Sequence, residues 1–191
     1  MSEEMIINHC SPTLAGIKTG ALFNCAYPSE REMRSAVRSW NKTLSPKGLR
    51  VLPLRYNGRT ALIYIYRPAM LSIDLKNETA RRLLAECGYV SETPEGCIVQ
   101  LMRRFAECDK FPHEIGLFLG YPPEDVCGFI ANKACGYKCA GYWKVYGDEE
   151  TAKKTFAKFE KCTRCYCRQH AKGTGIERLA VALSLIHISE P

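Results

Sequence analysis

Two pairs of neighbouring ionisable residues are the chain's best candidates for nucleophilic or acid–base chemistry. His9-Cys10 lies near the N-terminus and His113-Glu114 lies in the middle of the chain, each within two residues of a proline that favours a helix start. At a helix start, the dipole and a neighbouring imidazolium lower the pKa of a thiol. If the two helix starts meet, Cys10 is the expected nucleophile, His113 its base and Glu114 the residue that orients the base.

Further residues in the same stretches could bind a ligand beside these groups. Lys18 and Arg67 supply cations that suit a phosphate or a carboxylate, His9 supplies an imidazole, and Tyr121 supplies a ring and a hydroxyl. We therefore expect a small-ligand-binding or enzymatic domain that uses these residues. The sequence names no reaction, ligand or cofactor.

The alternative interpretation gives the ionisable pairs structural roles. Cys10 would then be a small buried hydrophobe, His113 a satisfied core or surface histidine, and Glu114 an acid that complements the helix dipole. This interpretation does not require the two helix starts to meet.

The C-terminal part of the chain has five cysteines that offer thiolates to zinc or an iron–sulfur cluster: Cys135, Cys139, Cys162, Cys165 and Cys167. At about 100° per residue, Cys167 shares the apolar face of its helix with Phe159, whereas Cys165 lies among the cations opposite. The first two cysteines also lack the usual tight zinc spacing. The pattern favours no metal; were one bound, Cys139, Cys162 and Cys167 would be its ligands. A thiol redox protein is a further alternative.

The segment 111–126 follows the spacing of a DNA-binding helix-turn-helix. Its second helix, however, opens with Pro-Pro-Glu-Asp at 122–125, and these residues would repel the phosphate backbone. A helical hairpin packed in the core explains the pattern better. The last long helix carries a basic stripe: Lys154, Lys158, Lys161, Arg168 and Lys172. Nucleic-acid or acidic-partner binding through this basic stripe is the alternative function, although most such stripes are solvated faces.

Length and composition indicate an ordinary globular protein. The chain has 191 residues, of which 46% are hydrophobic and 25% charged, and these values favour one domain over residues 1–182. The net charge of +7 gives a weak attraction to polyanions. The chain shows no export signal and no apolar run of about 18 residues, so we expect a cytoplasmic protein that does not enter a membrane. The 11 cysteines are then expected as reduced thiols or metal ligands.

The amino-acid pattern predicts the helices and strands that position these residues. Asn57-Gly58 between two apolar runs predicts a β-hairpin, and Pro53 requires its strand to be an edge strand or bulged. The first helix is expected to begin at Ser11. Further strands are expected over 21–27 and 142–146, and further helices over 29–44, 70–75, 78–87, 94–108, 112–120, from 122, over 148–172 and from 176. This order gives an α+β or α/β domain with a small mixed sheet of three or four strands covered by helices.

Several stretches together carry a family resemblance: residues 9–18, 64–67, 111–121, 123–126, 143–147, 161–162 and 166–167. On these, the chain resembles from about His9 to Ala182 a bacterial family known as domain of unknown function 3793. The resemblance implies no activity, cofactor or substrate. The remaining segment, 183–191, looks like a translated sequencing adapter, and we expect it to be foreign to the natural chain.

Overall fold

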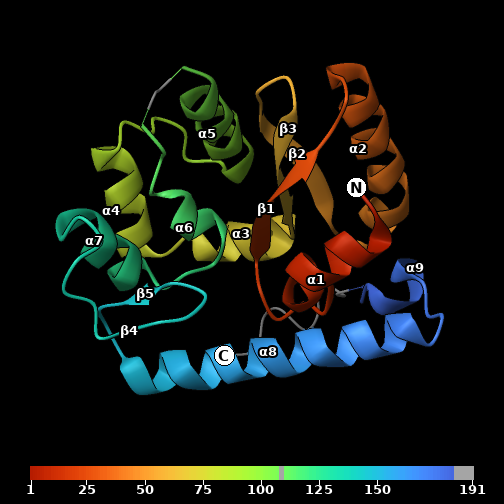
Figure 1. Cartoon of the computed structure of the whole chain (residues 1–191). Coiled ribbons are helices and arrows are strands. Elements are labelled where there is room, and N and C mark those ends of the chain that lie inside the picture. Colours follow the sequence, from red (N-terminus) through yellow and green to blue (C-terminus); the bar gives the residue numbers. More distant parts are fainter. Residues whose placement is uncertain (108–109, 183–191) are drawn as a thin grey trace. The chain divides into compact units, whose positions relative to one another are not determined.

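The computed structural model describes residues 1–107 and 110–182, so the expected adapter tail lies outside the described residues (Figure 1). Contacts divide the chain into two compact units. Unit 1 comprises residues 1–70 together with the chain from 161 onward, and unit 2 comprises residues 71–160. None of the helices in the described part of the chain is long and apolar enough to cross a bilayer. The expected single domain over 1–182 stays a prediction.

Unit 1 contains a three-stranded sheet whose order is β1-β3-β2. Its strands are β1 (Gly20–Ala26), β2 (Arg50–Tyr56) and β3 (Thr60–Tyr66). Both β1 and β2 pair antiparallel with β3, so the sheet is antiparallel throughout, where the sequence suggested a mixed sheet. The reason is that β3, the second strand of the hairpin, occupies the centre and keeps the two strands of equal direction apart.

The predicted hairpin is confirmed. Gly58 adopts a left-handed conformation with φ +88, and Oδ1 of Asn57 accepts the N–H of Thr60 at 2.8 Å. Pro53 lies in edge strand β2, and the register shifts between Pro53 and Arg55. The missing N–H of proline is therefore accommodated at an edge and beside a bulge, as its chemistry requires.

Several helices accompany this sheet in unit 1. They are α1 (Glu3–Leu14), α2 (Glu30–Leu44), the 3-10 turn η1 (Ser45–Lys47), α9 (Ile176–Leu179) and the later part of α8 (Glu149–Ala171). Helix α1 contacts β1, and α2 contacts β2 (Figure 1). The side chain of Asn41 in α2 exchanges two hydrogen bonds with the backbone of Val51, donating to its C=O at 2.8 Å and accepting its N–H at 2.9 Å.

The prediction that the first helix begins at Ser11 was wrong. Helix α1 starts after Ser2, whose Oγ accepts a backbone N–H at 3.2 Å as an N-cap. Ser11 and Pro12 instead occupy its last turn, where the missing N–H of proline costs a single hydrogen bond. Cys10 therefore lies toward the negative end of the helix dipole, which disfavours a thiolate.

Unit 2 is mainly helical. It contains most of α3 (Pro68–Asp74), then α4 (Glu78–Glu86), α5 (Pro94–Glu107), α6 (Ile115–Phe118), α7 (Pro123–Ala131), the strands β4 (Cys139–Ala140) and β5 (Lys144–Val145), and the first part of α8. With the sheet of unit 1, these elements confirm the predicted α+β class. The single turn α6 is buried, and a Cβ on its Gly116 would stand 2.8 Å from Val126 of α7, so the pair is a tightly packed helical hairpin.

Candidate functional site

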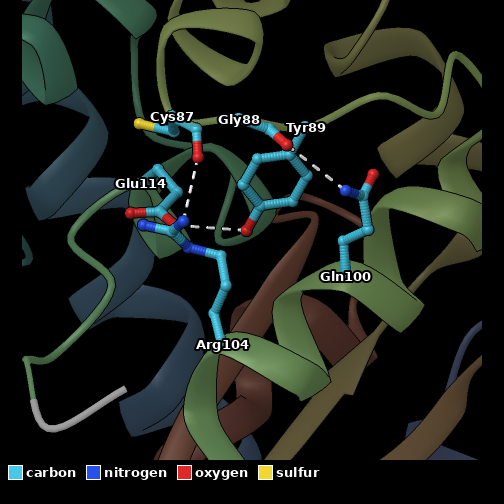
Figure 2. Close-up of polar contacts among 6 residues, drawn as sticks. All are labelled: Cys87, Gly88, Tyr89, Gln100, Arg104 and Glu114. Carbon is cyan, nitrogen blue, oxygen red and sulfur yellow. Dashed lines mark hydrogen bonds and ion pairs between the residues drawn. The ribbon is translucent and has the colours of Figure 1, made fainter. Parts of the chain in front are cut away.

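A buried carboxylate lies at the start of α6 in unit 2. The side chain of Glu114 is 3% exposed, and its Oε1 lies 2.5 Å from Nε of Arg104 on α5. The same oxygen accepts the hydroxyl of Tyr89 at 3.2 Å (Figure 2). A buried charge is tolerated only when it is paired and hydrogen-bonded, and these two partners meet that need for Glu114.

Two side chains of α5 hold the loop that follows α4. Nη1 of Arg104 donates to the carbonyl of Cys87 at 2.9 Å. The amide of Gln100 donates to the carbonyl of Gly88 at 3.4 Å and accepts the N–H groups of residues 90 and 91 at 3.0 and 3.1 Å (Figure 2). The chain leaves α4 through Gly88, which has φ +84. The backbone groups of this loop thus bond to side chains, which fixes where Tyr89 lies.

The tyrosine and the cysteine of this cluster are held in their neutral forms. Burial raises the pKa of Tyr89, and the charge of Glu114 raises it further. Burial also raises the pKa of Cys87, again with help from Glu114. Tyr89 therefore remains a hydrogen-bond donor at neutral pH and Cys87 remains a thiol. These two groups therefore stabilise the local structure, and neither is suited to transferring a proton.

A pocket of about 380 Å³ opens beside Tyr89 in unit 2. The lining residues come from the position just after α3, one face of α4, the loop after α4 and the first turn of α5: Leu75, Glu78, Arg81, Arg82, Leu84, Ala85, Tyr89, Val90, Ser91, Glu92 and Cys97. Arg81 meets Glu92 only at 4.0 Å, and both side chains are largely exposed, so this ion pair is weak. The pocket combines a tyrosine, several apolar side chains, two guanidinium groups and the carboxylates of Glu78 and Glu92.

A second, smaller pocket of about 330 Å³ includes Tyr121, which the sequence suggested as a ligand-binding residue. Asp74 and Asn77 contribute its polar groups. Burial raises the pKa of Tyr121 to about 12, and Tyr142 adds to the shift. The ring of Tyr121 also packs on Trp143, with centroids 5.0 Å apart, so it serves the core of unit 2 as well as the pocket.

Sequence reasoning missed the role of Asp125. Its side chain is 3% exposed, and Oδ1 accepts the N–H groups of Tyr146 and Gly147, each at 2.7 Å. Its Oδ2 accepts Nε1–H of Trp143 at 2.6 Å. The sequence indicated only that this acid would repel a nucleic-acid backbone, because nothing local shows that a segment about 20 residues later needs an acceptor.

The predicted nucleophile is buried in the core of unit 1. Cys10 is 0% exposed, and burial raises its pKa despite the opposing charge of Lys18. This favours the interpretation of Cys10 as a small buried hydrophobe. His9, which precedes Cys10 in α1, is exposed, and its ring stacks on that of Phe23 with centroids 5.2 Å apart and planes at 3°.

The two predicted ligand-binding cations of unit 1 are engaged by backbone carbonyls. Arg67 is 1% exposed and donates to the carbonyls of Thr13, Leu14 and Val181, each at 2.7 Å, and to that of Lys47 at 3.1 Å. Lys18 donates to the carbonyl of Gly20. Burial lowers the pKa of Arg67. Its guanidinium binds carbonyl groups at the C-terminal end of α1, which have no partner within the helix and carry partial negative charge.

The shared site of Cys10, His113 and Glu114 stays a prediction, because Cys10 belongs to unit 1 and the other two residues to unit 2. Within unit 2, Glu114 turns to Arg104 and Tyr89. His113 is exposed, and its ring contacts the ring of Phe129. Glu114 therefore contacts buried partners, whereas the neighbouring His113 lies at the surface of unit 2.

The cysteines of α8 follow the predicted wheel. Cys165 is exposed, whereas Cys167 is half-buried against the core of unit 1 and donates to Oδ1 of Asn8 at 3.1 Å. Cys162 lies in unit 1 and Cys139 in unit 2. Over residues 1–107 and 110–182, no three His, Cys, Asp or Glu side chains gather closely enough to hold a metal ion. Metal ligation by Cys139, Cys162 and Cys167 stays a prediction.

Comparison with known proteins gives a family for this chain. A family model described as protein of unknown function (DUF3793) matches residues 6–180. The chain belongs to this family. The DUF3793 match spans both units and includes Glu114, Arg104 and the pocket beside Tyr89. No curated protein and no solved structure matches the sequence, so the function of this DUF3793 chain has to be argued from its own residues.

Proposed function

We propose that unit 2 binds a small anionic molecule, a carboxylate or a phosphate, in the pocket beside Tyr89. The observation that carries this proposal is the placement of Tyr89, which lines the pocket while its hydroxyl donates to buried Glu114. A fixed aromatic wall needs little ordering when a ligand arrives, which favours binding. Arg81 and Arg82 line the same pocket, and a guanidinium matches a carboxylate or phosphate in shape and charge.

Binding is better supported than covalent catalysis. The thiol in the pocket, Cys97, is buried, and its pKa is raised by that burial and by Glu95. It donates to the carbonyl of Ser91 at 3.2 Å. The carboxylate behind the wall, Glu114, is neutralised by Arg104. Neither group resembles an activated nucleophile or a poised general base.

We also propose that the protein is cytoplasmic, because its many cysteines would be kept reduced in that compartment.

Isothermal titration calorimetry with inorganic phosphate, succinate and a nucleoside monophosphate tests the proposal on the full chain. We expect at least one probe to bind, and Arg82→Ala to weaken that probe at least tenfold. Arg103→Ala, which removes an exposed arginine of α5 outside the pocket lining, is the matched control and should leave the affinity unchanged. No heat with any probe, or equal loss in both variants, would contradict the proposal.

Polyanion binding through α8 is a second candidate function. The basic stripe predicted from the sequence is formed, and all its side chains are exposed: Lys154, Lys158, Lys161, Arg168 and Lys172. Binding of heparin should fall steeply with salt and weaken in Lys158→Glu. Absence of retention on heparin at low salt would remove this candidate.

A further inference from the structure

A chain of aromatic rings and one lysine runs across unit 2, away from the pocket lining. The ring of Phe111 lies 5.8 Å from that of His113, and His113 lies 5.1 Å from Phe129 of α7. Nζ of Lys144 lies 6.0 Å from the centroid of Phe129 and 4.5 Å from that of Tyr137. We call these five residues the aromatic ladder.

Three rings of the aromatic ladder remain open to solvent. Phe111 is 44% exposed and Tyr137 42% exposed, and His113 is also exposed. The other two members anchor them: Phe129 is half-buried, and Lys144 donates to the carbonyl of Ala134 at 2.8 Å. Phe111 packs edge-on against Phe105 of α5, with centroids 5.3 Å apart. The open rings are therefore held in place by the fold.

Each open phenyl ring has an exposed lysine as its chain neighbour. Lys110 precedes Phe111, and Lys138 follows Tyr137. Lys138 donates to the carbonyl of Gly147 from an exposed position, so its ammonium remains accessible to an anion. A surface that binds an apolar protein partner would have rings without cations beside them. Rings accompanied by cations match a chain of bases joined by phosphates.

We propose that the aromatic ladder binds single-stranded nucleic acid, with bases stacked on Phe111, His113 and Tyr137 and phosphates near the flanking lysines. Stacking on aromatic rings tolerates any base, so the binding has little sequence preference. The ladder shares no residue with the pocket beside Tyr89, and the two proposals stand or fall independently. It also differs from the basic stripe of α8, which offers charge without rings.

Fluorescence anisotropy with a labelled 12-nucleotide oligo(dT) tests this proposal on the full chain at low salt. Phe111→Leu and Tyr137→Leu keep apolar bulk but remove a ring, and each should weaken binding roughly 5- to 150-fold, the loss of one stacked base. Phe111→Trp and Tyr137→Phe keep a ring and should retain binding. Val99→Ala, an exposed apolar site of α5 outside the ladder, is the control.

Heparin, which has charge but no bases, separates stacking from charge alone. Its affinity should not change in Phe111→Leu or Tyr137→Leu. Absence of oligo(dT) binding by the wild-type chain would overturn the proposal. So would an unchanged oligo(dT) affinity in the leucine variants, because the surface would then bind through its charge alone. Circular dichroism melts of each variant confirm that a loss of binding is not a loss of fold.

Discussion

Nε1–H of Trp143 donates to Oδ2 of Asp125 over 2.6 Å, and the other oxygen of this carboxylate accepts two backbone N–H groups directly after β5. One buried side chain of α7 thus fixes both the indole beside β5 and the turn that leads toward α8. The indole packs edge-on against Phe156 of α8, with centroids 4.5 Å apart, so the carboxylate and the aromatic core of unit 2 support each other.

Asp125→Ala should destabilise the protein by on the order of 3–5 kcal/mol, because it leaves three partly buried N–H donors without an acceptor. Asp125→Asn should cost less, since its carbonyl oxygen still accepts the two backbone groups while its NH₂ faces the indole. Urea unfolding measures both. The neighbouring acid Glu124 is exposed, and Glu124→Ala should change the free energy of unfolding by less than about 0.5 kcal/mol. A cost as small for Asp125→Ala would contradict the assigned role.

Glu114 and Arg104 should behave as a coupled pair. Glu114→Ala leaves the buried hydroxyl of Tyr89 without its acceptor and the partly exposed guanidinium without its carboxylate, so a loss of about 1–3 kcal/mol is expected. The double variant with Arg104→Ala should cost clearly less than the sum of the single variants. A double-mutant cycle from urea unfolding provides the coupling energy. Strict additivity would show that the two side chains do not depend on each other.

Arg67→Lys should destabilise unit 1 although it conserves the charge. The ammonium of lysine cannot reach the four carbonyls that the planar guanidinium joins, and buried carbonyls without donors each cost about 1–3 kcal/mol. Thermal unfolding should show the loss. His9→Ala, on the exposed side of α1, is the matched control and should have a small effect. An unchanged melting temperature in Arg67→Lys would refute the structural assignment.

Tyr121 should make stability fall at alkaline pH. Its pKa rises from 10.0 in the unfolded chain to about 12 in the folded one, because burial disfavours the phenolate. The folded state therefore holds its proton longer, so this contribution is fully present below pH 10 and is lost between about pH 10 and 12. Tyr121→Phe should flatten the decline of unfolding free energy over that window. An identical slope in both proteins would mean that the phenol is not protected.

Cysteine reactivity should follow burial. Cys165 is exposed and should alkylate first, half-buried Cys167 more slowly, and Cys10 only when unit 1 opens. Cys167→Ser should cost less than about 1 kcal/mol, because the hydroxyl can still donate to Asn8. Cys10→Ser places a hydroxyl among apolar groups and should cost about 1–3 kcal/mol. Timed alkylation with peptide mass spectrometry measures the order, and joint release of Cys162 and Cys167 by a chelator would instead indicate a shared metal.

The sequence predicted correctly those turns and helix starts whose stabilising contacts lie within a few residues. The Asn57-Gly58 turn requires a left-handed residue, and the helix expected over 29–44 is α2, whose N-cap Ser29 accepts an N–H only three residues ahead. Ser11 was misread because an equally good cap, Ser2, lies upstream, and a proline in a last turn resembles one in a first turn.

The candidate site was predicted only in part, for a physical reason. The sequence singled out Glu114, but its partner Tyr89 lies 25 residues away and is joined to it by tertiary packing. Such partners leave no spacing pattern. Arg67 shows the reverse error, because a cation in a promising stretch is indistinguishable from a buried arginine until its carbonyl partners are seen.

The bond between Asn41 and Val51 also determines how β2 meets other molecules. Strand β2 is an edge of its sheet, and an exposed edge is a template for a strand from another chain. The amide of Asn41 already occupies the outward N–H and C=O of Val51, and two residues later Pro53 has no N–H to offer. An incoming strand would find neither of these positions open. This edge is thereby closed to the edge-to-edge polymerisation that small antiparallel sheets invite.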